Sequence, residues 1–334
     1  MSNVNRQFRL AARPVGRVKA SDFTFHEEPV PTPGPNQALV RNTYLSLDPT
    51  NRVWMSELDG YLPPVAIGEV MRGITLGEVV ASNRSDFAVG DKVTGLLGWQ
   101  DYAVIGEKGL PTKLAPVPLP DATLLGVLGG TGLTAYFGLL EIGQPKAGET
   151  VVVSAAAGAV GSIVGQLAKI HGCRVVGLAG TREKCELLVN ELGFDVAINY
   201  KDADWKKQLR AACPKGIDID FENVGGEILD AIVPMLNLRA RIVLCGLIST
   251  YNADKPVPGP NLGPVLVKRA RIEGFIILDY VPRFAEGAMQ LAKWVMEGKL
   301  KHRDTIVEGL ENAPSALNML FDGKNVGKLL VKIA

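Results

Sequence analysis

The sequence predicts a two-domain α/β protein, with a β-rich N-terminal domain and a central domain built on a parallel sheet. Three observations lead to this prediction. The chain has 334 residues, which is long for a single hydrophobic core. Residues 1 to about 125 contain short strand-like runs with turn residues between them. From about residue 129 to 280, strand-like apolar runs alternate with segments of helix length.

The N-terminal region contains short β-branched runs that are separated by Pro and Gly. Examples are QALVRNTYLSLD, ITLGEVVAS and GDKVTGLLGWQDYAVI. Short strands at close spacing, with turn residues between them, are typical of barrel-like β domains.

The central region has the rhythm of βαβ units. Its strand-like runs are TVVVSA, RVVGLAG, VAINY, IDIDFENVG, ARIVLCGLI and RIEGFII. Helix-length segments between such runs favour a mostly parallel sheet. The final segment, VGKLLVKIA, predicts one more strand. The segment DKPVPGPNLGP predicts a loop, because its four prolines do not fit a helix or a central strand.

The composition is that of a soluble globular protein. Apolar residues make up 47% of the chain, and a net charge of +1 gives no reason to expect a nucleic-acid or membrane partner. There is no apolar run long enough to span a membrane and no apolar segment of a signal peptide near the N-terminus. The four cysteines form no CxxC pair, so we expect free, mostly buried thiols in the cytoplasm.

The strongest local signal is a turn of small residues, Ala155–Gly161, between a strand and a helix. Gly158 would let the backbone approach a pyrophosphate, and Gly161 would let the helix pack closely on its strand. The amides at the helix start would bind phosphate. Ala156 replaces the first glycine of the GxGxxG pattern. The alternative is a tightly packed turn that binds no ligand.

The end of the next strand distinguishes between the two nicotinamide dinucleotides. A protein that binds NAD usually presents Asp or Glu to the adenosine ribose there. This chain has Gly180, followed by Thr181, Arg182 and Lys184. A hydroxyl and cations on the first turn of a helix suit a 2′-phosphate, so the sequence predicts NADP. Glu183 lies in the same turn, and a solvated basic helix start is the alternative.

Several longer segments carry a family resemblance along nearly the whole chain. They include NTYLSLDP, GWQDY, GLTAYFGLLEIGQPKAGETVVVSAAAGAVGSIVGQLAK, GCRVVGLAG, KGIDIDFENVGGEILD, CGLISTYN, EGFII, GLENAP and GKNVGKLLVKI. The chain resembles the medium-chain dehydrogenase/reductase superfamily, and within it the zinc-independent NADPH-dependent alkenal and enone reductases.

The resemblance implies a GroES-like β-barrel-type catalytic domain, formed by residues 1–128 with a C-terminal return at 301–334. It implies a Rossmann NADP-binding domain at 129–300 and a homodimer. Thr50 and Tyr61 are expected to line the substrate pocket. Thr50 stands where the family commonly has a Tyr, so we expect a wider or differently shaped pocket. The implied NADP contacts are Gly158, Ala159, Val160, Gly161, Thr181, Lys184, Tyr200, Asn223, Cys245, Gly246, Leu247, Ile248, Ser249, Thr250, Tyr251, Phe275, Ile276, Ile277 and Asn325.

The cysteine and histidine content argues against a metal site. Zinc alcohol dehydrogenases of this superfamily need Cys and His ligands from the catalytic domain. Residues 1–172 contain no cysteine, and the chain has three histidines, His26, His171 and His302. We therefore expect no metal, and a hydride acceptor that needs little polarisation, such as an α,β-unsaturated carbonyl.

The predicted reaction is hydride transfer from NADPH to the β-carbon of an enone or alkenal. Charge then collects on the carbonyl oxygen, and the candidate donors to it are the nicotinamide ribose 2′-hydroxyl and the Tyr251 phenol. A packing role in its own loop is the alternative for Tyr251. Two other functions stay open: a quinone reductase of the zeta-crystallin type, and a non-catalytic NADPH-binding protein.

Overall fold

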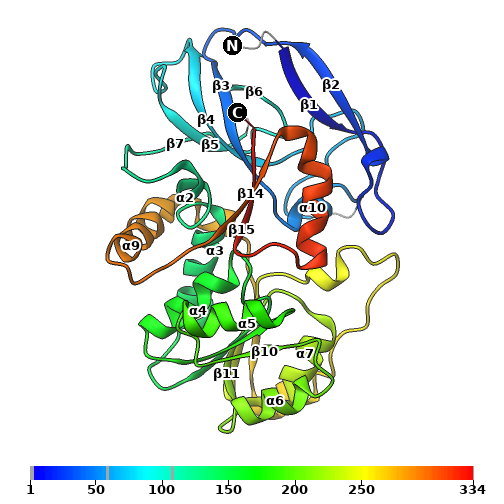
Figure 1. Ribbon diagram of the computed structural model, residues 1–334, viewed down its shortest axis with the longest axis vertical. Helices are drawn as coiled ribbons and strands as arrows, with labels where there is room; N and C mark the ends of the chain where they lie inside the picture. Colours follow the sequence, from blue (N-terminus) through cyan, green and yellow to red (C-terminus); the bar gives the residue numbers. More distant parts are fainter. Residues whose placement is uncertain (1–3, 58–59, 107–108, 334) are drawn as a thin grey trace. The chain divides into compact units, whose positions relative to one another are not determined.

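The structure is a computed structural model that describes residues 4–57, 60–106 and 109–333 (Figure 1). The chain divides into two units. The first comprises Met1–Leu125, Thr305–Lys324 and Leu329–Ala334, and the second Gly126–Asp304 and Asn325–Lys328. The first unit contains a seven-stranded β sheet and a separate pair of strands, and the second contains a parallel sheet. The predicted fold class is therefore confirmed.

The first unit has a seven-stranded sheet in the order β14-β15-β3-β4-β5-β7, with β6 also paired to β3. The strands are β3 (Ala38–Ser46), β4 (Ile74–Ser82), β5 (Lys92–Gly95), β6 (Tyr102–Ile105), β7 (Thr112–Lys113), β14 (Asp304–Glu308) and β15 (Lys328–Lys332). A separate antiparallel pair is formed by β1 (Val4–Leu10) and β2 (Phe23–Pro29). The helices are α1 (Thr50–Trp54), α2 (Asp121–Leu125) and α10 (Ala313–Asp322), with 3-10 turns η1 (Ala20–Asp22) and η6 (Leu310–Asn312).

The C-terminal strand completes the core of the first unit. β15 pairs antiparallel with β3, and Leu329 and Val331 are fully buried with Leu45 and Trp99. The strand predicted in VGKLLVKIA is therefore confirmed, and it belongs to the same sheet as strands from the N-terminal third of the chain.

The second unit has six parallel strands in the order β10-β9-β8-β11-β12-β13. They are β8 (Thr150–Val153), β9 (Arg174–Ala179), β10 (Val196–Asn199), β11 (Ile217–Glu222), β12 (Leu236–Leu244) and β13 (Arg271–Gly274). The chain runs outward from β8 to β10, returns to β11 and runs outward to β13. The order therefore reverses between β8 and β11, which is the topological switch point of the sheet.

Helices cover both faces of this sheet (Figure 1). One face packs against α3 (Gly130–Phe137), α4 (Gly161–Ile170), α5 (Arg182–Asn190) and α9 (Phe284–Met296). The other packs against α6 (Trp205–Ala212), α7 (Gly226–Ile232) and α8 (Gly263–Lys268). Shorter helical segments are η2 (Gly138–Gly143), η3 (Val233–Met235), η4 (Ile248–Thr250) and η5 (Ile277–Arg283).

Helix α4 buries an apolar stripe along most of its length. Ile163, Val164 and Leu167 are at most 2% exposed, whereas Ile170 at the end of the helix is 36% exposed. The Pro-rich segment is a loop up to Gly263, where α8 begins. The loop predicted for the Pro-rich segment is therefore confirmed up to the start of α8.

The central strand β11 carries charges that such a strand rarely has. Ile219 and Phe221 face the core on the α4 side, as expected for a strand covered on both faces. Asp220 and Glu222 alternate with them, and both are fully buried. Buried carboxyls need hydrogen-bond partners, and Glu222 finds them in the loops of the candidate site.

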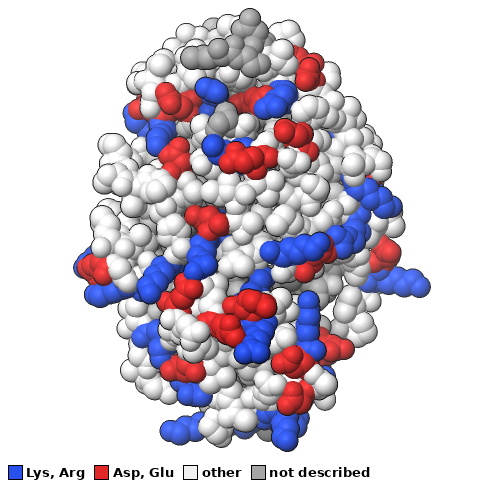
Figure 2. All heavy atoms as spheres, in the orientation of Figure 1, with Lys and Arg blue, Asp and Glu red and all other residues white. Residues whose placement is uncertain are grey.

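The surface carries a mixture of charges. On the face drawn in Figure 2, basic and acidic side chains are interspersed, in keeping with 36 basic and 35 acidic residues. All four cysteines are free; Cys173 and Cys213 are buried, while Cys185 and Cys245 are partly exposed. Among the described residues, none of the helices is both long and apolar enough to span a bilayer.

Candidate dinucleotide-binding site

The turn after β8 is held in an unusual backbone conformation. Ala155 has φ of 47°, a left-handed value that costs energy for a residue with a side chain. Its carbonyl accepts a hydrogen bond from the Gly158 amide at 2.9 Å, which closes the turn. Strained backbone of this kind is concentrated at functional sites.

Small residues let the turn, the helix and the neighbouring strand approach closely. A Cβ on Gly161 would lie 2.6 Å from the Ala155 carbonyl oxygen, so a side chain there would clash with the turn. A Cβ on Gly177 in β9 would lie 2.9 Å from the Ala156 Cβ. The role expected for Gly161, close packing of the helix start, is therefore seen in the structure.

A short segment from the C-terminal part of the chain pairs with this turn. Gly158 and Gly327 form an isolated parallel bridge, and the Gly327 amide donates to the Ala157 carbonyl at 2.9 Å. The side-chain amide of Asn325, which is 7% exposed, donates to the Gly327 carbonyl at 2.9 Å. Asn325 is thus ordered beside the glycine-rich turn of the second unit.

The end of β9 shows why an acidic residue is absent at position 180. A Cβ on Gly180 would lie 2.9 Å from the Tyr200 hydroxyl oxygen. The Tyr200 side chain, which follows β10, therefore occupies the space that an Asp or Glu would need. Burial and the charge of Lys201 both lower the pKa of Lys184. An anion bound there would stabilise both cations.

The other predicted polar groups at this helix start differ in their roles. Thr181 is the N-cap of α5, and its hydroxyl accepts from the Lys184 amide at 3.3 Å. Arg182 instead bonds to Glu186 at 2.8 Å, and its side chain is 86% exposed. Lys184 is therefore the better placed of the two cations for a ligand at this strand end.

Residues after β11 contact those after β8 across the switch point. The Asn223 amide donates to the Ser154 hydroxyl at 2.7 Å, and its side-chain amide donates to the Ser154 carbonyl at 2.8 Å. The Ser154 hydroxyl in turn donates to Glu222 Oε1 at 2.5 Å. Neither Ser154 nor Glu222 is among the site residues predicted from the sequence. A buried Ser and Glu at two strand ends were the available signal.

The loop after β12 is anchored to the same place. The Cys245 and Gly246 amides donate to the Glu222 carbonyl at 2.9 and 3.1 Å. Burial, with a contribution from the Glu222 charge, raises the pKa of the Cys245 thiol to about 12. Cys245 is therefore a protonated, unreactive thiol at neutral pH.

Tyr251 folds back on its own loop. Its hydroxyl oxygen accepts a hydrogen bond from the Leu247 amide at 3.0 Å. A phenol that accepts one hydrogen bond still has a proton to donate, so this contact is compatible with both roles considered for Tyr251. The structure supports the loop-ordering role directly.

The segment after β13 completes the set. A Cβ on Gly138 would lie 2.5 Å from the Phe275 ring, so the ring packs closely against η2. The predicted cofactor residues thus follow β8, β9, β10, β11, β12 and β13, or pair with the β8 turn. Because the strands are parallel, these positions share the carboxyl edge of one sheet, where dinucleotides bind in open α/β sheets.

The two residues expected to line a substrate pocket contact each other in the first unit. The Thr50 hydroxyl, on α1, lies 2.5 Å from the Tyr61 hydroxyl. The Tyr61 ring meets Trp54 edge-on with a centroid distance of 6.5 Å, and Tyr61 is 42% exposed. The small Thr50 side chain thus leaves room for Tyr61 to reach it.

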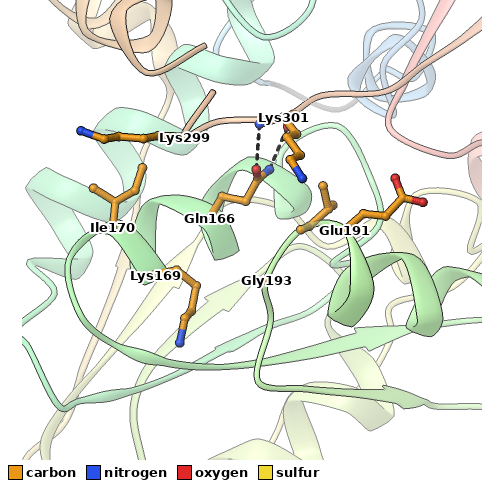
Figure 3. Close-up of a pocket in the computed structure, with 8 residues that line it drawn as sticks. Gln166, Lys169, Ile170, Glu191, Gly193, Lys299 and Lys301 are labelled. Carbon is orange, nitrogen blue, oxygen red and sulfur yellow. Dashed lines mark hydrogen bonds between the residues drawn. The ribbon is translucent and has the colours of Figure 1, made fainter. Parts of the chain in front are cut away.

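The cavity drawn in Figure 3 is a different feature of the second unit. It has a volume of about 350 Å³, and none of the predicted cofactor residues lines it. Gln166 closes one wall through two 2.8 Å hydrogen bonds with the Lys301 backbone. Its charged residues include Lys169, which is paired with Asp195, and Glu191, which is paired with Arg303. We attach no ligand to it.

Residues 4–57, 60–106 and 109–333 contain no group of three or more His, Cys, Asp or Glu side chains that is arranged to hold a metal ion. His171 is the C-cap of α4, and its Nδ1 lies 2.8 Å from the Leu167 carbonyl oxygen.

Comparison with known proteins places the chain among oxidoreductases. Residues 6–112 match the family model for the N-terminal domain of oxidoreductase, and residues 159–294 match the model named zinc-binding dehydrogenase. The NADPH-dependent curcumin reductase of Escherichia coli is 49% identical, over 99% of this chain and 97% of that protein. The NADP(+)-dependent 2-alkenal reductase of Nicotiana tabacum is 40% identical, over 99% and 98%. The crystal structure of CurA from Vibrio vulnificus in complex with NADPH superimposes with a TM-score of 0.93, at 49% identity and over 98% and 99% of the two chains.

The close packing at Gly161 gives a direct test of the turn. Gly161→Val should lower the thermal midpoint by several degrees, because overpacking costs about 1–3 kcal/mol. It should also weaken dinucleotide binding at least roughly tenfold, because a displaced helix start no longer presents its amides. Gly259→Ala is the control, since a Cβ there meets nothing within 4 Å. Equal affinity of the Gly161→Val protein and wild type, measured by nicotinamide fluorescence, would show that this turn does not bind the ligand.

Proposed function

We propose that this chain, which belongs to the zinc-independent alkenal and enone reductases of the medium-chain dehydrogenase/reductase superfamily, reduces the C=C bond of α,β-unsaturated ketones and aldehydes with NADPH. The reaction class is supported by the names of relatives that match nearly the full length of the chain. The cofactor is supported by the arrangement at the ends of β9 and β10, and that arrangement is the observation on which the proposal chiefly rests.

The residues present fit NADPH for three reasons. The glycine-rich turn leaves room for a pyrophosphate above the start of α4. Tyr200 fills the position of the acidic residue that would repel a 2′-phosphate. Burial and the charge of Lys201 lower the pKa of Lys184, and a bound anion would stabilise the Lys184 cation.

When bound, NADPH supplies the hydride for the β-carbon of the substrate. The chain's own residues then have two tasks. The loops at the carboxyl edge hold and orient the dinucleotide, and hydrogen-bond donors stabilise the charge that develops on the substrate carbonyl oxygen. We assign the protein's part of this second task to the Tyr251 phenol, whose oxygen is fixed by the Leu247 amide.

Two wider aspects belong to the same proposal. We place the protein in the cytoplasm, where a reducing environment suits its four free thiols. We place the Thr50–Tyr61 pair at the substrate, where Thr50 and the 42% exposed Tyr61 would shape the acceptor end of the pocket.

We also propose that the protein is a homodimer that joins through β13. This strand is at the edge of the six-stranded sheet, so one side of its backbone is open for pairing. Leu266, Val267 and Ile272 on and beside it are 78%, 67% and 39% exposed. A second copy presents the same edge and the same apolar side chains, so a two-fold contact is self-complementary.

The cofactor assignment predicts a selective effect at Lys184. Lys184→Ala should raise the Michaelis constant for NADPH roughly tenfold to a hundredfold, because a charge-assisted bond to phosphate is lost. The constant for NADH should stay within about threefold, since NADH lacks that phosphate. Arg182→Ala is the matched control, because its guanidinium is committed to Glu186. A wild type that uses NADH as well as NADPH contradicts the assignment.

The role of Tyr251 predicts a change in turnover. Tyr251→Phe should lower kcat for a simple enone by about ten- to a thousandfold, the range for loss of an oxyanion donor. Single-turnover reduction at saturating NADPH isolates this step from cofactor binding. If the rates are equal and only the NADPH dissociation constant rises, Tyr251 orders its loop and the ribose hydroxyl alone polarises the substrate.

The dimer proposal predicts a mass of twice 35.7 kDa by light scattering on a sizing column. Leu266→Asp combined with Ile272→Asp should give the monomer mass, because charges on the edge oppose pairing. Met289→Asp is the control, since Met289 is also exposed, at 68%, but lies on α9. A wild type with the monomer mass contradicts the proposal. A dimer that persists in the Leu266→Asp/Ile272→Asp protein rules out this interface.

A further inference from the structure

One residue, Glu222, connects the three loops that carry the central part of the candidate site, two through its side chain and one through its backbone. Glu222 Oε1 accepts hydrogen bonds from the Ser154 hydroxyl at 2.5 Å, from the Val224 amide at 2.5 Å and from the Gly225 amide at 3.0 Å. The same residue's backbone carbonyl receives the Cys245 amide. Glu222 is fully buried, so these donors have no water to replace it.

This junction lies at the topological switch point. Ser154 follows β8 and Glu222 ends β11, the two strands between which the order of the sheet reverses. The Ser154 hydroxyl also accepts the Asn223 amide, so one side chain links the glycine-rich turn to the turn after β11. The crevice that receives a ligand in such sheets opens between these two turns.

The neighbouring carboxyl shows that burial alone does not explain the junction. Asp220 is on the same strand and the same face, and it is also fully buried. Neither of its oxygens has a hydrogen-bond partner among the described residues. Burial and the proximity of Glu222 raise the pKa of Asp220 well above its usual range. Asp220 therefore accepts no hydrogen bond from the described residues, whereas Glu222 binds donors from two loops.

We propose that Glu222, acting with Ser154, is the positioning residue of the cofactor site and that its side chain holds the loops after β8 and β11 in the conformation that receives the dinucleotide. The proposal rests on the function proposed above. Glu222 touches neither cofactor nor substrate; it acts through Asn223 and the glycine-rich turn.

The expected effect follows from the population of the binding-competent loops. If removal of the junction lowers that population to about one tenth, the apparent dissociation constant rises about tenfold. Chemistry in the fully loaded enzyme is unaffected, because bound NADPH selects the competent conformation. Loss of a positioning residue therefore weakens NADPH binding and leaves kcat unchanged. A general loss of stability would not separate these two quantities.

Four variants test the proposal in the full-length protein. Glu222→Ala removes the acceptor, and Ser154→Ala removes the hydroxyl that joins the two turns. Glu222→Gln is the conservative rescue, because its amide oxygen can accept the same three donors. Asp220→Asn is the matched control at an equally buried position of the same strand. The readouts are the dissociation constant for NADPH, from nicotinamide fluorescence, and kcat for an enone at saturating NADPH.

We expect Glu222→Ala and Ser154→Ala each to raise the dissociation constant at least tenfold, with kcat within about threefold of wild type. Glu222→Gln and Asp220→Asn should bind NADPH within about threefold of wild type. The double variant Ser154→Ala/Glu222→Ala should be little weaker than the worse single variant, because both act in one network. Should Glu222→Ala fail to fold, Ser154→Ala, whose smaller side chain fits the same space, decides the question.

Unchanged NADPH affinity in a folded Glu222→Ala or Ser154→Ala protein overturns the proposal, even if the thermal midpoint falls. An equal loss of affinity in Asp220→Asn also overturns it. These outcomes are separate from the proposed function, because binding is measured without substrate. Weaker binding in the variants, together with a wild type that reduces no enone, would overturn the function and leave the positioning role intact.

Discussion

Parallel strand pairing is the constraint on which the rest of this structure depends. Six strands that all run the same way bring six carboxyl ends to one edge, and every predicted cofactor segment of the second unit lies at one of these ends or pairs with the first. The backbone groups that leave the sheet there need new partners. The structure supplies them through Ser154, Glu222 and the segment around Gly327, so the loops are ordered by the same contacts that satisfy their polar atoms.

Shape and charge at this edge act together. Small residues at Gly158, Gly161 and Gly177 allow close approach of backbone, and a side chain at any of them would meet the turn or its neighbour. Tyr200 occupies the place of a ribose-binding acid, and burial together with the charge of Lys201 lowers the pKa of Lys184. An acidic residue here would select NAD, whereas this arrangement suits a ligand that brings its own anion.

The fold class and the succession of strands along the chain could be predicted from the sequence. The reason is that the alternation of apolar runs with segments of helix length is a local signal. The close packing of Gly161 was predictable for the same reason. The Tyr200–Gly180 contact and the Ser154–Glu222 bond were not, since each joins residues 20 or more positions apart through side-chain geometry. Tyr251 shows the limit most clearly: its residue type fits an oxyanion donor, and only the structure reveals that its oxygen accepts the Leu247 amide.

The measurement that tests the central claim most directly is identification of the product. Purified protein is incubated with NADPH and an open-chain enone, and the product is examined by mass spectrometry and NMR, with NADPH deuterated at the transferable position. The account predicts a saturated ketone with one deuterium on the former β-carbon and one NADPH consumed per ketone formed. An allylic alcohol with deuterium on the carbonyl carbon, or no product while a quinone is reduced readily, would contradict it.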